Sequence, residues 1–194
     1  MNDPDSPDLP GSDLRALELD DDGELVGGRV VGARHSGQSF TGARLVDVEL
    51  IRCDLAGCDF SETSLHRVQI VDCRCNGIDF GGARWRFGRV GDCRLDEANF
   101  RMAKLERLRF DGSVCTAADF GGAHLDDVQF AGCDLSAADM SNAHCNDVDL
   151  RGARLDRLRG VGSLRGATIG VDQLFGLAAG LAAAAGLTVV DHDG

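Results

Sequence analysis

The chain contains no tyrosine, one tryptophan and one lysine, Lys104, and its three prolines all lie within the first ten residues. Acidic residues outnumber basic ones by 32 to 20, so the net charge of −12 argues against a protein that binds nucleic acid through a basic surface. The longest apolar stretch, within residues 177–187, is too short to span a bilayer. The chain starts with acidic residues and lacks the features of a secretory signal, so we expect a cytoplasmic location.

Apolar residues recur at every fifth position from Leu25 to Leu155. Of these 27 central positions 26 are apolar, and the residue two before each centre is never charged. A helix would rotate this column by about 140° per repeat, and one long strand would alternate its faces. The pattern therefore predicts short strand segments whose first and third residues point inward, joined by two-residue corners that are rich in glycine. His35, the one polar centre, is expected to be a tolerated defect.

Residues of matched size also recur every 20 positions, which predicts four repeats per coil. The main column contains Phe40, Phe60, Phe80, Phe100, Phe120 and Met140, and we expect it to form a stacked core ladder. Phe110 and Phe130 form a second column of this kind. A spacing of 15 would place Leu55 above Phe40 and would give no such ladder. Further repeats at both ends, out of register with the main array, bring the expected total to about eight coils.

Repeats such as Cys58-Asp59-Phe60-Ser61-Glu62 and Ala118-Asp119-Phe120-Gly121-Gly122 resemble the A(D/N)LXX signature of the pentapeptide repeat family. The resemblance covers nearly the whole chain. It implies an all-β fold, a right-handed quadrilateral β-helix, which we assign to residues 12–171. Residues 1–11 are acidic and proline-rich, and we expect them to be disordered.

The sequence of residues 172–194 predicts a helix followed by a short strand. Asp172 is expected to cap a helix that runs to about residue 185 and stops at Gly186, and residues 187–190 are expected to form the strand. The helix is apolar on nearly every face, so it must be buried on more than one side. We expect one side to close the last coil and the other to bind a second copy, giving a homodimer. The expected interface residues are Leu174, Phe175, Leu177 and Leu181.

No motif in the sequence points to catalysis. A nucleophile elbow, a phosphate-binding loop, a zinc-protease motif and a dinucleotide-binding turn are all missing from the sequence. The eight cysteines all occupy the inward columns, which favours small, reduced, buried side chains over metal ligands. We therefore expect neither an enzyme nor a cofactor nor a metal site, and a deep pocket would be needed to revive an enzymatic function.

Charge is strongly segregated along the chain. Residues 84–109 carry a net charge of +4, whereas residues 110–150 carry eight aspartates and no basic residue. Aspartate is common before the centre of this repeat, but that preference does not explain Asp126, Asp127 or Asp147. In a dimer joined at the C-termini, two such regions would adjoin and could imitate the phosphates of duplex DNA. The candidate partner-binding residues are Asp111, Asp119, Asp126, Asp127, Asp134, Asp139, Asp147 and Asp149.

Within the family, the chain is most similar to the actinobacterial fluoroquinolone-resistance members, because its array is uninterrupted and its alanine-rich helix begins with Gly170-Val171-Asp172-Gln173. That resemblance implies a dimeric DNA mimic that binds DNA gyrase or a related type II topoisomerase and contacts neither nucleic acid nor membrane. Such a protein would inhibit the enzyme or protect it from quinolones and other poisons. The alternative is a non-catalytic interaction scaffold for a different partner.

Overall fold

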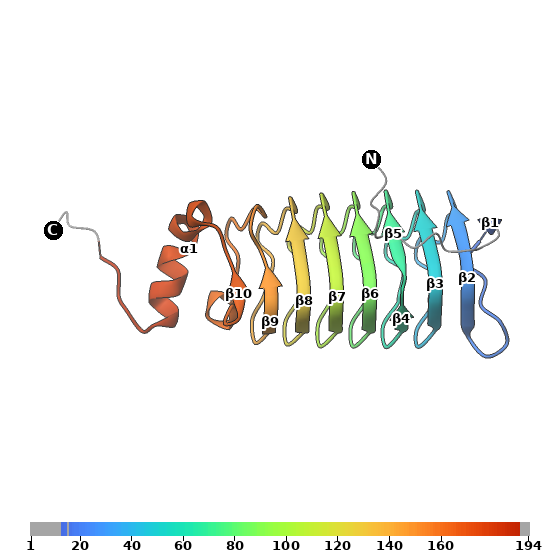
Figure 1. The fold of residues 1–194 in the computed structure, drawn as a ribbon, viewed down its shortest axis with the longest axis horizontal. Helices are drawn as coiled ribbons and strands as arrows, with labels where there is room; N and C mark the ends of the chain where they lie inside the picture. The colour runs from blue at the N-terminus through green and yellow to red at the C-terminus, as the bar shows by residue number, and fades with distance from the viewer. Residues whose placement is uncertain (1–12, 15, 191–194) are drawn as a thin grey trace.

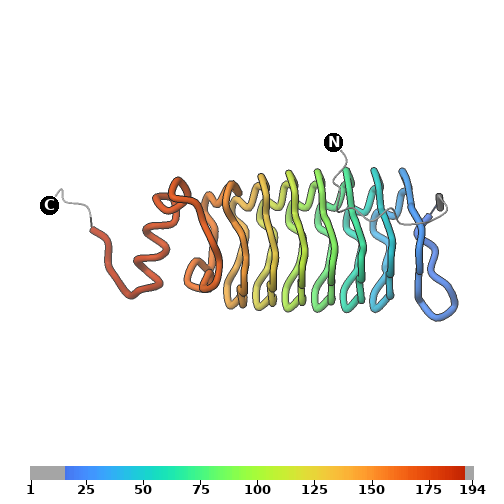
Figure 2. Tube along the Cα trace, viewed as in Figure 1, coloured from blue at the N-terminus to red at the C-terminus, as the bar shows by residue number. Residues whose placement is uncertain are grey.

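Parallel strands stack along one axis, and a helix covers the C-terminal end of the stack (Figures 1 and 2). The computed structural model describes residues 13–14 and 16–190, so the segment 1–11, expected to be disordered, lies outside the described residues. The strands are β1 (Asp13–Leu14), β2 (Glu24–Val31), β3 (Arg44–Ile51), β4 (Ser64–His66), β5 (Gln69–Val71), β6 (Arg84–Gly91), β7 (Lys104–Asp111), β8 (His124–Ala131), β9 (His144–Asp149) and β10 (Ala167–Thr168). A 3-10 turn, η1 (Val161–Ser163), and the helix α1 (Val171–Ala184) complete the fold.

The pairing register confirms four repeats per coil. Leu25 pairs with Leu45, Leu45 with Leu65, and Leu65 with Trp85, always 20 residues apart. The rod therefore has four faces and about seven turns, fewer than the eight expected. We number the faces in chain order by their central residues: the first from 25 to 145, the second from 30 to 150, the third from 35 to 155 and the fourth from 40 to 140. The first and second faces carry the strands, whereas the third and fourth are joined by isolated parallel bridges.

The corners adopt the left-handed conformation that the glycines predicted. Gly42, Gly57, Gly82, Gly122 and Gly152 have φ values between 64° and 75°. Sixteen non-glycine residues at equivalent corners also have positive φ, between 51° and 59°. Most of them are charged or short, but two are bulky and apolar, Phe87 and Met102. A positive φ is uncommon outside glycine, and for a bulky side chain it is unfavourable.

The core is the stacked ladder predicted from the 20-residue spacing. Ring centroids lie 4.8 Å apart for Phe40 and Phe60, 5.3 Å for Phe80 and Phe100, and 4.8 Å for Phe100 and Phe120. Met140 continues the column and is fully buried. The second column also forms, since Phe110 stacks on Phe130 at 4.8 Å. Matched residues in successive coils therefore fill the interior of the rod.

The cysteines occupy the same interior. Seven of the eight are buried, and Cys145, near the C-terminal end, is half-buried. Burial raises the pKa of the Cys133 thiol to about 11 and raises the pKa of Cys115 well above its ordinary value. These thiols are therefore neutral at physiological pH and act as small core residues.

One coil departs from the regular interior. Trp85 is completely buried, and a β-carbon placed on Gly88 would lie 2.1 Å from its indole Nε1. Gly88 therefore leaves the space that the larger ring fills. The indole Nε1 has no hydrogen-bond partner within residues 16–190. This coil therefore contains an adaptation that the repeat itself does not require.

The expectation that His35 is a tolerated defect is wrong. The backbone N–H of Leu17 donates a hydrogen bond of 2.9 Å to His35 Nε2, so Nδ1 carries the ring proton and donates to Gln38 Oε1 at 2.8 Å. Leu17 is buried, and β1 pairs with β2 at an offset of 16 residues rather than 20. The buried histidine thus fastens an N-terminal segment that lies out of register with the array.

The C-terminal helix closes the other end of the rod. Its N-cap is Gly170 rather than Asp172, which lies in the first turn, and Gln173 accepts a hydrogen bond of 2.6 Å from the Gly170 N–H. Gly186, with a φ of 76°, ends the helix as predicted. The strand predicted for residues 187–190 is wrong, because these residues are exposed and pair with no strand. No helix in the described part of the chain has the length and apolar character needed to span a bilayer.

The phenylalanine ladder gives a direct test of the fold. Phe80 is 1% exposed and lies between Phe60 and Phe100 in the stack. We expect Phe80→Ala to lower the free energy of unfolding by about 3–5 kcal/mol, because it leaves a cavity inside the rod. Phe80→Leu, which retains most of the volume, should cost clearly less. Denaturation by urea measures both variants, and equal, small losses would show that the ladder does not stabilise the rod.

Candidate protein-interaction surface

The eight aspartates between residues 110 and 150 surround the rod. Asp126, Asp127 and Asp147 lie on the first face, and the other five are spread over the remaining three. Those five form ion pairs with arginines: Asp111 with Arg89 and Arg109, Asp119 with Arg101, Asp134 with Arg154, Asp139 with Arg159, and Asp149 with Arg151. Every one of these arginines lies outside residues 110–150. The local charge of −8 is therefore partly neutralised by arginines of the same and of neighbouring coils.

Asp126, Asp127 and Asp147 keep the exposed position expected from the sequence. All three are exposed, and within residues 16–190 none of them forms an ion pair. Asp126 accepts a hydrogen bond from the Asn146 amide. The imidazole rings of His124 and His144 stack beside them with centroids 4.5 Å apart. These three carboxylates make a small acidic cluster at the C-terminal end of the first face.

The fourth face carries a longer row of acidic residues that local charge counting missed. Isolated parallel bridges place Ser39, Asp59, Asp79, Asn99, Asp119, Asp139 and Arg159 in one column along the rod. Neighbouring members are separated by the spacing of adjacent strands, about 4.8 Å. In the repeats centred on residues 40 to 140, the outward positions of this face hold five acidic residues and one basic residue, Arg101, and Arg159 ends the column. By contrast, the first face holds six of each sign, and the second and third faces five of each. The fourth face is therefore the acidic face of the rod.

The carboxylates of this row are fixed by their own backbone. Each accepts a hydrogen bond from the N–H two residues later: Ser61 donates to Asp59 at 2.9 Å, Gly81 to Asp79 at 2.7 Å, Gly121 to Asp119 at 2.8 Å and Ser141 to Asp139 at 2.8 Å. Hydrogen bonds from Ser61 hold the pKa of Asp59 below its usual range, and Ser141 has the same effect on the pKa of Asp139. The row is thus a preformed array of carboxylates, of which Asp119 and Asp139 are also ion-paired with Arg101 and Arg159.

Short side chains flank the row. The corners of the fourth face contain Gly42, Gly81, Gly82, Gly121 and Gly122, and Met102 is its one exposed large apolar residue among residues 16–190. Thr41 adds a hydroxyl that donates to Asp59 Oδ2 at 2.7 Å. Glu62, Arg101 and Met102 are the long exposed side chains at the corners of this face, so a broad partner surface can approach the carboxylates most closely beside the glycines.

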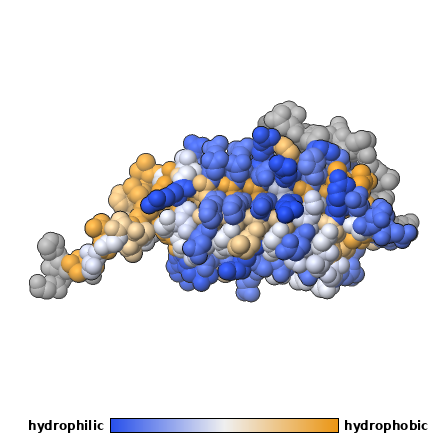
Figure 3. Space-filling model, turned by 90° about the horizontal axis from the view of Figure 1, so that it is seen from below, coloured by the Kyte–Doolittle hydropathy of each residue, from blue (hydrophilic) through white to orange (hydrophobic). Residues whose placement is uncertain are grey.

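The four residues of the C-terminal helix that are expected at a dimer interface differ in their exposure. Leu177 is 3% exposed and Leu181 packs against the core, so the prediction that Leu177 faces a second copy is wrong. Leu174 is 44% exposed and Phe175 is 81% exposed. Val171 and the tail residues Leu187, Val189 and Val190 extend this exposed apolar surface, and Figure 3 shows hydrophobic residues gathered at this end of the molecule.

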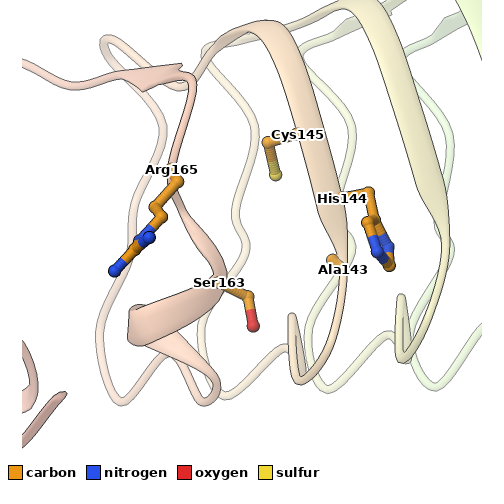
Figure 4. A pocket seen from close by; sticks show the side chains of 5 residues that line it. All are labelled: Ala143, His144, Cys145, Ser163 and Arg165. Carbon is orange, nitrogen blue, oxygen red and sulfur yellow. The ribbon is translucent and has the colours of Figure 1, made fainter.

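A pocket of about 250 Å³ lies beside the last coil, lined by Ala143, His144, Cys145, Ser163 and Arg165 (Figure 4). Burial raises the pKa of Cys145, so its thiol is a poor nucleophile. The polar side chains do not converge on one point in Figure 4. Within the described residues, no group of three or more histidine, cysteine or acidic side chains is placed to hold a metal ion. The pocket therefore offers no arrangement that would perform chemistry.

Comparison with known proteins agrees with this architecture. A model of the pentapeptide repeat region matches residues 91–159, and a model of eight pentapeptide repeats matches residues 39–74. No curated protein matches the sequence. Among solved structures, a trypsin-treated form of QnrB1, a plasmid-mediated fluoroquinolone resistance protein, is 25% identical, with 87% of this chain and 84% of that chain covered and a TM-score of 0.47. HetL, a pentapeptide repeat protein involved in heterocyst differentiation regulation in Nostoc, is 19% identical, with 74% and 86% covered and a TM-score of 0.25.

The two family matches together span more than half of the 194 residues, and the pairing at 20-residue intervals continues through both of them and the segment between. The chain belongs to the pentapeptide repeat family.

Proposed function

We propose that this protein is a non-catalytic interaction scaffold that imitates DNA and binds the basic DNA-binding surface of a type II topoisomerase, such as DNA gyrase. The observation that carries the proposal is the row of Asp59, Asp79, Asp119 and Asp139 on the fourth face. The sequence resemblance to fluoroquinolone-resistance members supports the same partner. Binding would modulate the enzyme and protect it from quinolones or other poisons by competing with DNA.

Rigidity strengthens this interaction. The carboxylates are already held by backbone hydrogen bonds, so little conformational freedom is lost when a partner binds.

Duplex DNA carries one charge per about 1.7 Å of its axis, which is a denser array than one carboxylate per coil. Electrostatic attraction over such a row steers the encounter and weakens as salt is added. The acidic row from Asp59 to Asp139 spans four coil spacings, about 19 Å per chain, and a dimer would carry two such rows.

A different protein partner is the second candidate. It is favoured by the balance of charges on the other three faces, which a uniformly anionic DNA mimic would not show. Each of those faces presents patches of both signs, as an interaction scaffold for a different partner would.

The acidic row can be tested with matched sets of substitutions. We expect the combined variant Asp59→Asn, Asp79→Asn, Asp119→Asn and Asp139→Asn to bind gyrase at least tenfold more weakly, because it removes the anionic row but retains its shape. The control variant combines Asp126→Asn, Asp127→Asn and Asp147→Asn on the first face. Supercoiling assays with and without a quinolone, together with affinities measured at several salt concentrations, check the outcome.

Three results of this experiment would redirect the proposal. Wild-type protein that neither inhibits nor protects gyrase at micromolar concentration would reject the gyrase partner. Loss of binding in the control variant alone would move the contact to the first-face cluster. Equal losses in both variants would show that total charge, rather than the fourth face, determines affinity.

The homodimer is tested separately at the C-terminal helix. Phe175 is 81% exposed, so we expect Phe175→Asp to keep the fold and halve the mass measured by light scattering. Leu177 is buried within its own chain, so Leu177→Asp should instead lower the melting temperature. A wild-type monomer, or an unchanged mass for Phe175→Asp, would reject this interface.

A further inference from the structure

Phe87 is an aromatic residue at an unfavourable corner of the first face. It lies in β6, its φ is 57°, and it is 42% exposed. A bulky side chain in the left-handed region is a conformational outlier. Comparable corners, at Gly27 and Arg67, use glycine or a charged residue. The chain therefore keeps an exposed ring where glycine would be easier to accommodate, and such local strain is concentrated at functional sites in proteins.

The neighbouring coils hold the ring in place. The guanidinium carbon of Arg107, one coil further on, lies 5.1 Å from the Phe87 centroid. The His66 ring, one coil before, meets it edge-on, with centroids 5.4 Å apart and an interplanar angle of 78°. Both sides of the ring along the rod axis are thus occupied. Arg107 occupies one face of the ring, which limits the stacking of a planar base, whereas an apolar side chain can pack against the exposed part of the ring.

Cationic side chains surround this ring. Residues 64–67, 84–87 and 104–107, which we name the basic-aromatic patch, contain five basic residues and one acidic residue, Glu106. Glu106 pairs with Arg86 at 2.7 Å. Arg84 and Lys104 are exposed and, within residues 16–190, have no ion pair. The patch therefore presents uncompensated positive charge on a chain whose net charge is −12.

We propose that the basic-aromatic patch binds an acidic peptide segment of a protein partner that carries an apolar side chain. The carboxylates pair with Arg84, Lys104 and Arg107, and the apolar side chain packs against the edge of Phe87. Aromatic side chains, phenylalanine included, and arginine are both enriched at protein interfaces. The patch is opposite in charge to the fourth face and uses different residues, so this inference is independent of the proposed topoisomerase partner.

A nucleic acid fits this patch less well. Single strands bind by stacking bases on open aromatic faces, whereas Arg107 lies over one face of Phe87 and His66 contacts the ring at an interplanar angle of 78°. The next coil of the first face carries the exposed carboxylates of Asp126 and Asp127, which would repel a phosphate backbone that continued along the rod.

The probes are defined peptides and the full chain. A fluorescein-labelled peptide with one leucine between two runs of five glutamates is titrated by fluorescence polarisation, next to a matched peptide with glycine in place of leucine. An oligothymidylate of 12 nucleotides tests the nucleic-acid alternative. We expect the leucine peptide to bind at least fivefold more tightly than the glycine peptide, and the oligonucleotide to bind more weakly than either.

Phe87→Gly separates a binding role from a structural one. Glycine adopts the corner conformation without strain, so this variant should melt at the same temperature as the wild type or higher, while losing at least fivefold in affinity for the leucine peptide. Arg107→Glu should lose at least tenfold. The matched control is Arg157→Glu, since Arg157 is an exposed corner residue with a φ of 56° on the third face, and its affinity should not change.

Several outcomes would overturn the proposal. Unchanged peptide affinity in Phe87→Gly, or a lower melting temperature without loss of affinity, would make Phe87 a structural residue. Tighter binding of the oligonucleotide would indicate a nucleic-acid site. Equal losses in Arg107→Glu and Arg157→Glu would indicate binding by overall charge. A tenfold gain on deletion of residues 1–12 would show that an acidic segment of this chain occupies the patch.

Discussion

The structure depends on the hydrogen bonds that link each coil to the next along the rod axis. The Phe60 N–H donates to the Asp79 carbonyl at 2.7 Å, and the Phe80 N–H donates to the Asn99 carbonyl at 2.7 Å. These bonds fix each residue above the residue 20 positions earlier. Inside the rod, the constraint demands side chains of matched size, and the phenylalanine ladder meets it. Outside, it places every charge between two neighbours that are distant in sequence.

That external constraint explains why the acidic row of the fourth face is informative. Like charges on adjacent strands are destabilising, so a column of aspartates has a cost for folding. Elsewhere the chain avoids the cost, since Asp54 on the third face pairs with Arg74, and Arg29 on the second face pairs with Glu49. On the fourth face, Asn99 interrupts the column and donates to Asp79 at 2.8 Å, and Asp119 and Asp139 pair with arginines, so the cost is reduced there, but Asp59 and Asp79 remain adjacent. Each aspartate also has a local structural role, since it accepts the N–H two residues later, whereas the scarcity of basic residues on this face is the feature that the proposed binding to a basic surface would use.

The sequence predicted the regular part of the fold well because the constraint is periodic. The spacing of five identified the inward residues and the left-handed corners, and the spacing of 20 identified the stacked columns. It failed where residues leave the array. The helix begins at Val171, because Gln173 accepts a hydrogen bond from the N-cap residue Gly170, and Leu177 points inward because it covers the last coil. The candidate surface was harder to predict, because counting charge along residues 110–150 ignores partners such as Arg89 and Arg154, which lie 20 or more residues away.

Two departures from the repeat lie in one coil, and their proximity suggests that they have a common reason. In β6, Trp85 fills the interior beside Gly88, and Phe87 projects outward at a corner where glycine would be more stable. A uniform array could have used leucine inside and glycine outside, as Leu25 and Gly27 do at the start of the first face. Neither substitution improves the pairing between coils, which continues unchanged from β4 to β7. Trp85 inside the rod and the exposed ring of Phe87 therefore mark the coil whose residues are least explained by the stability of the rod. A second partner is best sought at this coil.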